Sequence, residues 1–244
     1  MSGRVSKHAA VETREGVGVT VKRLFPVPGL RNLDPFVLWD HFSVAPGTGF
    51  PDHPHRGFEA ITYMLAGSMQ HTDNLGNRST VTAGGAQRFT AGRGIVHSEM
   101  PGGSGDNTGI QLWINLPRRL KDAAPAYQQV DADAFPVEHF AAGWKKTLVG
   151  EGSPLQLLSD VCYSELQLEA GGHFEEILPE GFTGLAYLLQ GRARVAGQDI
   201  DAGSACFVTE ASRIVMDSEV GCRLMLCLGR PHGEPIYQHE PYVD

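Results

Sequence analysis

Two short segments in the first half of the chain place histidines and a carboxylate two residues apart. They are His53-Pro54-His55 and His97-Ser98-Glu99. In an extended strand, residues i and i+2 point to the same face, so each segment would present two donor side chains together. Three imidazoles and one carboxylate suit Fe(II), Mn(II), Ni(II), Cu(II) or Zn(II). If the two strands face each other, they would form one mononuclear metal site with coordination positions left open for a substrate.

Two carboxylates compete for the fourth position. Glu59 follows the first histidine pair and Glu99 ends the second segment. Spacing alone does not separate them. Gly92 and Gly94 stand shortly before His97, and they would bring the backbone into the site in a tight turn.

The elements that must position these side chains are predicted to be strands. Short runs rich in β-branched and aromatic residues recur along the chain, separated by glycine turns, as in 17–21, 60–65, 110–115, 185–189 and 224–228. Many short strands at such spacing indicate an all-β sandwich or barrel. The only helix we expect is a short one over 118–124, ended by Pro125.

An internal repeat divides the chain. Gly57-Phe58, Tyr63, Leu65 and Gly67 recur 124 residues later as Gly181-Phe182, Tyr187, Leu189 and Gly191, and further matches follow in the same order. The repeat predicts two copies of one β-barrel, joined near 125–136. We therefore expect an N-terminal domain over 1–130 that contains the metal site and a C-terminal domain over 131–244 closed by the C-terminal tail.

The second copy lacks the donors of the first. The offset places Ile177 and Pro179 at the positions of the first histidine pair, and Val215 or Met216 at the position of His97. The second barrel is therefore not expected to hold this metal. His173 is interpreted as a surface or turn histidine.

Composition narrows the classes of function. The net charge is −8, which disfavours direct binding to nucleic acid through phosphates. No apolar run is long enough to span a bilayer, so no membrane contact is expected. The four cysteines, Cys162, Cys206, Cys222 and Cys227, include no C-x-x-C pair and are expected to be reduced thiols of a cytoplasmic protein.

These motifs together resemble a known family, the pirins, which are bicupins of the cupin superfamily. Segments 53–59 and 90–101 resemble its two metal motifs, 34–40 its N-terminal signature, and 111–117 a further block. Segments 234–236 and 241–243 resemble its closing segment, with Glu240 where the family usually has glycine. The resemblance covers almost the whole chain and implies two tandem cupin (jelly-roll) barrels.

The resemblance also implies roles for particular residues. It makes His53, His55, His97 and Glu99 the metal ligands, because pirins take the carboxylate from the second motif, whereas most cupins take it from the first. Glu59 would then be an outer or alternative ligand. The implied cofactor is one divalent metal ion, with Fe(II) as first choice and Zn, Mn, Ni or Cu as alternatives.

The implied activity is that of a quercetin 2,3-dioxygenase, which opens the ring of a flavonol with O2 and releases CO. Glu99 would accept the proton of the 3-hydroxyl, with Glu59 as second choice. Trp113, Phe58 and Met64 are candidates for an apolar pocket wall, and Gln111 for a hydrogen bond that holds a ligand. One alternative is an iron- and redox-responsive co-regulator that binds a protein partner. Another is a metal-containing enzyme that acts on a related small phenol rather than on a flavonol. A monomer is expected.

Overall fold

The structure is a computed structural model that describes residues 3–239 and 241–244, so Glu240 lies outside the described residues. The described chain is built of strands and contains no α-helix. The predicted helix over 118–124 is reduced to one 3-10 turn, Arg118–Leu120, and a second such turn spans Ala132–Ala134. The all-β prediction is confirmed. No helix among the described residues has the length and apolar character to cross a membrane.

The chain forms two compact units, whose boundaries differ from the predicted 1–130 and 131–244. The N-terminal barrel comprises Val11–Ala134, Leu155–Ser159 and His232–Asp244, and the C-terminal barrel comprises the described part of 1–10, Phe135–Pro154 and Asp160–Pro231. The first strand, β1 (Arg4–Ala9), pairs with β19 (Ser204–Thr209) of the C-terminal barrel. The C-terminal tail belongs to the N-terminal barrel, because its backbone and side chains bond to Arg56 and Lys121 there.

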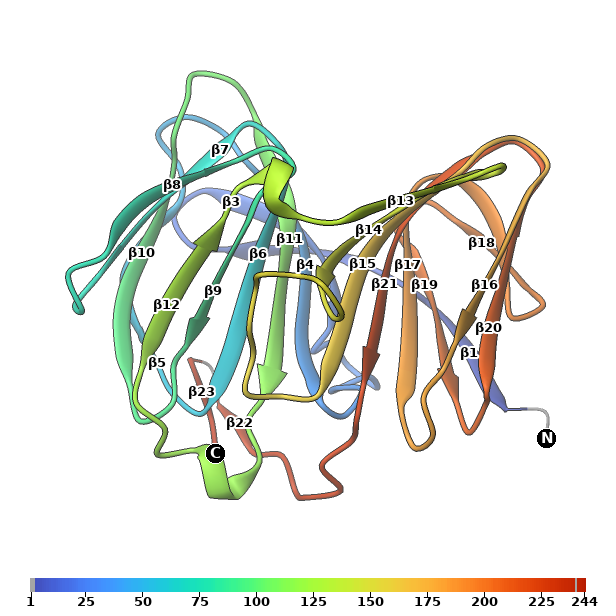
Figure 1. The fold of residues 1–244 in the computed structure, drawn as a ribbon. Helices are drawn as coiled ribbons and strands as arrows, with labels where there is room; N and C mark the ends of the chain where they lie inside the picture. Colours follow the sequence, from blue (N-terminus) through green and yellow to red (C-terminus); the bar gives the residue numbers. More distant parts are fainter. Residues whose placement is uncertain (1–2, 240) are drawn as a thin grey trace. The chain divides into compact units, whose positions relative to one another are not determined.

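The larger sheet of the N-terminal barrel has seven strands in the order β12-β9-β6-β11-β4-β3-β2 (Figure 1). Their bounds are β2 (Val11–Glu15), β3 (Val19–Phe25), β4 (Phe36–Val44), β6 (Phe58–Ala66), β9 (Ala86–Thr90), β11 (Asn107–Asn115) and β12 (Ala126–Val130). The central strand β6 is buried on both faces over most of its length, as its apolar sequence requires.

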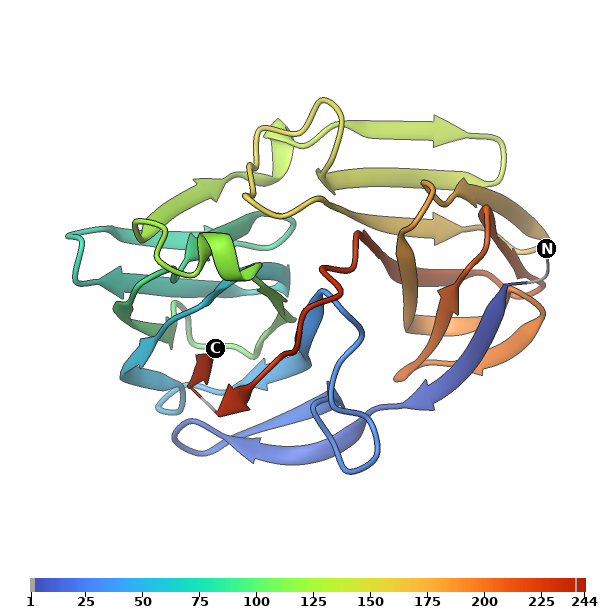
Figure 2. The ribbon, with the colours of Figure 1, turned by 90° about the horizontal axis from the view of Figure 1, so that it is seen from below.

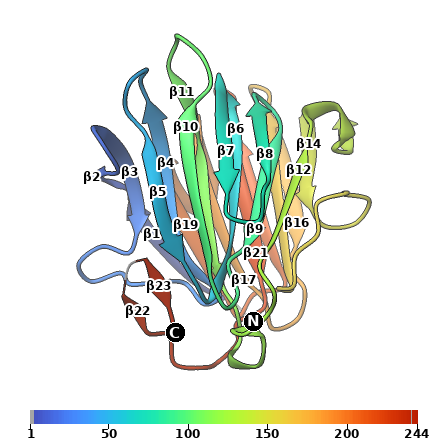
Figure 3. The ribbon, with the colours of Figure 1, turned by 90° about the vertical axis from the view of Figure 1, so that its left-hand side faces the viewer.

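A second sheet of four strands, in the order β5-β10-β7-β8, supplies the metal motifs. The strands are β5 (Phe50–His55), β7 (Ser68–Asp73), β8 (Arg78–Thr82) and β10 (Ile95–Pro101), and Figure 3 shows them side by side. Along β10, Ile95, His97 and Glu99 are buried, whereas Val96 is exposed and Ser98 is half-buried. This alternation turns the donor side chains of β10 to the interior.

A short two-stranded sheet ends the chain. It pairs β22 (Gln238–His239) with β23 (Tyr242–Val243), and Figure 2 shows it beside the strands of the N-terminal barrel. Arg56 forms a bridge to Tyr242, its guanidinium lies 4.4 Å from the Tyr242 ring centroid, and it bonds both carboxylate oxygens of Asp244 at 2.9 and 2.8 Å.

The C-terminal barrel contains one sheet with the path β1-β19-β17-β21-β15-β14-β13, to which β16, β18 and β20 are attached. The bounds are β13 (Val137–Phe140), β14 (Gly143–Val149), β15 (Val161–Leu168), β16 (Gly172–Ile177), β17 (Thr183–Val195), β18 (Gln198–Asp201), β20 (Arg213–Ser218) and β21 (Cys222–Gly229). Its core is mostly aliphatic, with Phe182 and two cysteines among the buried side chains. The four cysteines, all in this barrel, are free thiols, as predicted.

The sequence repeat corresponds to equivalent strands. β6 lies between β9 and β11 in one barrel, and β17 lies between β19 and β21 in the other. Gly67 and Gly191 occupy the same place in the repeat, and both have positive φ, 70° and 78°. The two copies therefore share one strand order and one turn geometry.

Candidate metal centre

Pairing of two neighbouring strands brings the predicted histidines together. In the antiparallel ladder of β5 and β10, His53 is the Cα partner of His97, and His55 is the partner of Ile95. The strands are neighbours within one sheet rather than facing strands of opposite sheets. Because His53 and His55 are two residues apart, both imidazoles stay on the face that His97 occupies.

The three imidazoles form a compact cluster. Each of His53, His55 and His97 offers one ring nitrogen such that all three atoms lie within 4.8 Å of one another. The ring centroids are separated by 4.5 Å for His53 and His97, 4.6 Å for His53 and His55, and 5.0 Å for His55 and His97. Among the described residues this is the only group of three or more donor side chains arranged in this way.

Each ring uses its Nδ1 for an outward hydrogen bond. His53 Nδ1 lies 2.7 Å from the carbonyl oxygen of Pro51, and His55 Nδ1 lies 3.0 Å from that of Pro241. His97 Nδ1 lies 3.5 Å from Nδ1 of His71. An imidazole that donates from Nδ1 keeps its lone pair on Nε2, where it can bind a metal.

The C-terminal tail is part of this arrangement, because it supplies the acceptor for His55. Lys121 Nζ donates to the carbonyl oxygens of Gly57 and Val243, at 2.8 and 2.7 Å, and so joins the tail to the turn after the first motif. Gly57 has a φ of 84°, and a Cβ there would lie 1.8 Å from the Val243 oxygen. Only glycine therefore allows the tail to approach this closely.

Two of the imidazoles are held neutral. Burial, followed by repulsion from His53, lowers the pKa of His55 to about 3. Burial, followed by repulsion from His55, lowers the pKa of His97 well below 6.5. A neutral imidazole is the form that binds metals, so both rings are in the required state at neutral pH.

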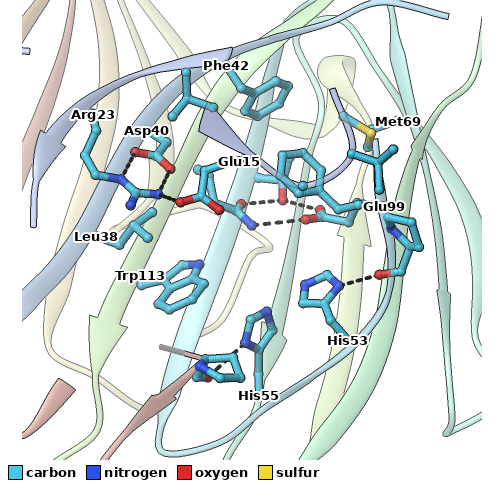
Figure 4. Close-up of a pocket in the computed structure, with 18 of the residues that line it drawn as sticks. Glu15, Arg23, Leu38, Asp40, Phe42, His53, His55, Met69, Glu99 and Trp113 are labelled. Atoms are coloured by element: carbon cyan, nitrogen blue, oxygen red, sulfur yellow. Dashed lines mark hydrogen bonds and ion pairs between the residues drawn. The ribbon is translucent and has the colours of Figure 1, made fainter. Parts of the chain in front are cut away.

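Glu99 lies beside the cluster, with both oxygens already bonded. Its Oε1 accepts a hydrogen bond from Gln87 Nε2 at 2.6 Å and lies 2.7 Å from the Thr62 hydroxyl, and its Oε2 accepts one from Gln111 Nε2 at 3.1 Å. Figure 4 shows Glu99 in the same pocket as His53 and His55. The sequence predicted that Gln111 would hold a metal ligand by a hydrogen bond, and Gln111 does donate to Glu99, the carboxylate predicted to be a ligand.

Glu59 points to the other face of the sheet. It is three residues from Thr62, which lines the pocket, so strand alternation turns it away from the histidines. Glu59 is fully buried and accepts hydrogen bonds from the backbone N–H groups of Leu158 and Ser159, from the Ser159 hydroxyl and from Thr90. These bonds anchor segment 155–159, and they leave Glu59 without a place near the cluster.

The cluster opens into a cavity of about 450 Å³, which is within the usual range for small-molecule sites. Trp113 lines this cavity, as predicted for a pocket wall. Phe58 and Met64 are not among the lining residues. Phe58 stacks on Trp113 with ring centroids 4.1 Å apart, and Met64 is fully buried in an apolar cluster with Phe42 and Met69.

A group of charges lies elsewhere in the same cavity. Arg23 bonds both oxygens of Asp40, at 2.8 and 2.6 Å, and contacts Glu15 at 2.7 Å (Figure 4). Two carboxylates thus share one guanidinium. The lining also includes Asp52 and Glu99, so four carboxylates face a single guanidinium. Such a cavity attracts cations and ligands rich in hydrogen-bond donors.

Sequence reasoning missed several polar residues around the cluster: Glu15, Arg23, Asp40, Thr62, His71, Asp73 and Gln87. A signal existed for one pair. His71-Thr72-Asp73 has the same two-residue spacing as the metal motifs, and it ends a strand just before a turn. The others stand singly in their strands, and only strand pairing brings them to the site.

Comparison of the sequence with known proteins assigns the chain to a family. The family described as Pirin matches residues 18–114, and the Pirin C-terminal cupin domain matches residues 163–244. The chain belongs to the pirin family. A pirin-like protein of Caulobacter vibrioides is 39% identical over 243 residues, which cover 95% of this pirin and 88% of that protein. Human pirin is 35% identical over 243 residues, which cover 95% of this chain and 84% of the human protein.

Solved structures agree with the fold. The crystal structure of quercetin 2,3-dioxygenase from Acinetobacter baumannii matches this pirin with a TM-score of 0.91 and 26% identity, over 100% of this chain and 92% of that one. The prediction of two tandem cupin barrels is thereby confirmed.

The donor set of this pirin fits a divalent metal ion. Nε2 of His97 is buried and has no hydrogen-bond partner in the structure. Leaving a buried ring nitrogen unpaired has an energetic cost, and a metal ion shared with His53 and His55 would remove it. The cluster can therefore hold a metal through three imidazoles.

Proposed function

We propose that this pirin is a metal-dependent dioxygenase that opens the ring of flavonols such as quercetin. The observation that carries the proposal is the cluster of three imidazoles beside a carboxylate in one cavity. His53, His55 and His97 would bind the metal through Nε2, and Glu99 would serve as fourth ligand and proton acceptor. Fe(II) is the proposed ion, with Zn, Mn, Ni and Cu as alternatives that the same donors accept.

The bound metal would act as a Lewis acid that lowers the pKa of the flavonol 3-hydroxyl, as metals do for bound water. Glu99 then takes the proton. Its acceptor strength is shaped by Gln87, Gln111 and Thr62, which hold the carboxylate through uncharged groups. Among the described residues, the side chains bonded to Glu99 are all uncharged, so no cationic side chain has to leave before the carboxylate accepts the proton.

The reaction balances without a further reductant. Quercetin and O2 give a depside and CO: both oxygen atoms enter the depside, and the carbon that bore the 3-hydroxyl leaves as CO. The proton held by Glu99 returns to the product carboxylate. The protein therefore has to bind, deprotonate and orient the flavonol, which is work that positioned side chains perform.

The charged end of the cavity supports a polyphenol as substrate. The carboxylates of Glu15 and Asp40 accept hydrogen bonds, and Arg23 offsets only part of their charge. Phenolic hydroxyls distant from the metal would donate to them, whereas an anionic carboxylate substrate would be repelled. The A. baumannii relative, named for quercetin, is consistent with this class of ligand.

The test is quercetin consumption and CO release by the iron-loaded protein. We expect turnover well above that of free iron. The variant Glu99→Gln should keep the fold and lose about 10²-fold or more in kcat, since it removes the proton acceptor. Glu59→Gln, whose side chain lies on the other face of the sheet, should retain kcat. Turnover no faster than that of free iron would refute the proposal.

The alternative function is that of an iron- and redox-responsive protein that binds a partner and has no substrate of its own. The human relative is named pirin, without an activity. This reading predicts that the Fe(II) and Fe(III) forms capture different proteins in a pull-down. Equal capture by both forms, together with flavonol turnover, would exclude it.

A further inference from the structure

Two side chains on β7 lie directly behind the metal cluster. β7 is the neighbour of β10 on the side away from β5, and the register pairs Asp73 with His97 and His71 with Glu99. The side chains of His71 and Asp73 are fully buried. A buried histidine with a buried carboxylate needs a role, because placing both polar groups in the interior is costly unless their hydrogen bonds are satisfied.

Their hydrogen bonds form a chain with one direction. His71 Nε2 lies 3.0 Å from Asp73 Oδ2. Asp73 also accepts hydrogen bonds from the backbone N–H groups of Leu75 and Asn77 and from the Asn77 side chain. A carboxylate surrounded by donors can only accept, so His71 must donate from Nε2. With this proton on Nε2, the imidazole of His71 has its lone pair on Nδ1, which faces Nδ1 of His97 at 3.5 Å.

The direction continues into the cluster. If Nδ1 of His71 accepts, Nδ1 of His97 must donate, and the lone pair of His97 is on Nε2, the buried nitrogen without a partner. His53 and His55 obtain the same state from the carbonyl oxygens of Pro51 and Pro241. His97 is the one cluster member whose acceptor is a side chain.

The plane of the His71 ring is also fixed. Tyr127 stacks on it, with ring centroids 4.2 Å apart and planes inclined by 19°. The Tyr127 hydroxyl donates to Gln87 Oε1 at 2.9 Å, and Gln87 donates to Glu99 at 2.6 Å. One aromatic ring thus supports the acceptor of His97 and, through Gln87, the carboxylate proposed as base.

We propose that His71 is the positioning residue of the metal centre, with Asp73 setting its tautomer so that His97 presents Nε2 to the metal. The inference shares with the proposed function the metal bound by His53, His55 and His97, and rests on it to that extent. It does not require a flavonol substrate. An outer acceptor of this kind orients the ligand ring and raises its basicity, and its loss typically weakens metal binding about 10–100-fold.

The test uses Co(II) as probe, measured by chelator competition and by its visible absorption. His71→Phe keeps the stacking on Tyr127 but has no acceptor, and we expect its Co(II) affinity to fall about 10–100-fold. His71→Asn restores an acceptor oxygen close to the position of Nδ1 and should recover most of the affinity. His41→Phe, which replaces a half-buried histidine of β4 outside the cavity lining, is the matched control and should bind as the wild type does.

A measurement on the wild-type protein covers the case in which His71→Phe does not fold. The paramagnetic NMR spectrum of the Co(II) form should contain three exchangeable ring N–H signals, one for each Nδ1–H of His53, His55 and His97. Two signals, or an unchanged Co(II) affinity in a folded His71→Phe, would overturn the inference. Wild-type protein that binds Co(II) as described yet leaves quercetin intact in its iron form would refute the proposed function and leave this inference standing.

Discussion

The two barrels share a strand order but differ at the place where the first gathers its histidines. In the N-terminal barrel, β10 buries Ile95, His97 and Glu99, and in the C-terminal barrel β20 buries Ile214, Met216 and Ser218. The pairing partner of His97 is His53, and the partner of Met216 is Phe174. The positions of His53 and His97 thus carry imidazoles in one copy and the apolar side chains of Phe174 and Met216 in the other.

In the C-terminal barrel, Glu176 occupies the position equivalent to His55. Strand register shows this equivalence, because Glu176 is opposite Ile214 as His55 is opposite Ile95. Glu176 bonds Lys145 at 2.6 Å, and Lys145 lies 5.8 Å from the Phe174 ring. An ion pair therefore satisfies the one carboxylate, and no second group of metal donors occurs among the described residues. The strand arrangement shared by the two barrels therefore permits a metal site, whereas the side chains on the inner face of the strands decide whether one exists.

The largest effect should come from exchanging the matched residues of the two barrels for alanine. His97→Ala removes an imidazole and should weaken metal binding by more than about 100-fold, since even outer partners contribute 10–100-fold. Met216→Ala should leave the metal content unchanged and instead lower the free energy of unfolding by about 2–5 kcal/mol. Metal analysis and denaturant unfolding check both variants. Full metal content in His97→Ala would contradict the assignment.

Glu59→Gln should distinguish the structural role of Glu59 from the metal-binding role proposed for Glu99. The amide replaces one accepting oxygen with a donor that faces the N–H groups of segment 155–159. We expect a loss of about 1.5–3 kcal/mol in the free energy of unfolding, the range for a hydrogen bond to a charged group. Metal content should stay at the wild-type value. Loss of the metal without loss of stability would return Glu59 to the ligand set.

Removing residues 241–244 should sharpen the role of the tail. His55 would lose the carbonyl of Pro241, and the metal affinity should fall about 10-fold. Asp244→Ala is the control, because it breaks only an exposed ion pair with Arg56, of a kind that contributes little to stability, and keeps Pro241. Equal metal affinity in both variants, by chelator competition, would show that the tail does not orient His55.

Acid should weaken the metal-free N-terminal barrel. Burial, followed by repulsion from Lys22, lowers the pKa of His41 to about 4, and burial lowers that of His55 to about 3. The unfolded chain takes up these protons near 6.5, so it binds more protons than the folded chain between pH 6.5 and 3. Stability is thus complete above about 6.5 and declines as the pH falls through this window. Hydrogen exchange at pH 7 and pH 5 would measure it, and equal protection of β4 and β5 at both values would contradict the expectation.

The sequence by itself determined the donors and the duplication. The two-residue spacing fixes which side chains share a face of a strand, so His53 with His55, and His97 with Glu99, could be paired without a structure. The same local rule, with the repeat, identified strands, turns and a second copy that lacks equivalents of His53, His55 and His97. These properties depend on residues close together in the chain.

Only the tertiary structure decided which strands are neighbours. The offset of the repeat pointed to Ile177 and Pro179, but strand register places Phe174 and Glu176 at the positions of His53 and His55. The reason is that the connection from β16 to β17 (178–182) is longer than the one from β5 to β6 (56–57). Register likewise selected Met216 over Val215. The tail pairs with the barrel that is distant in sequence, and β7 brings His71 and Asp73 behind His97. Such pairings depend on contacts across many residues, which periodicity within one strand does not encode.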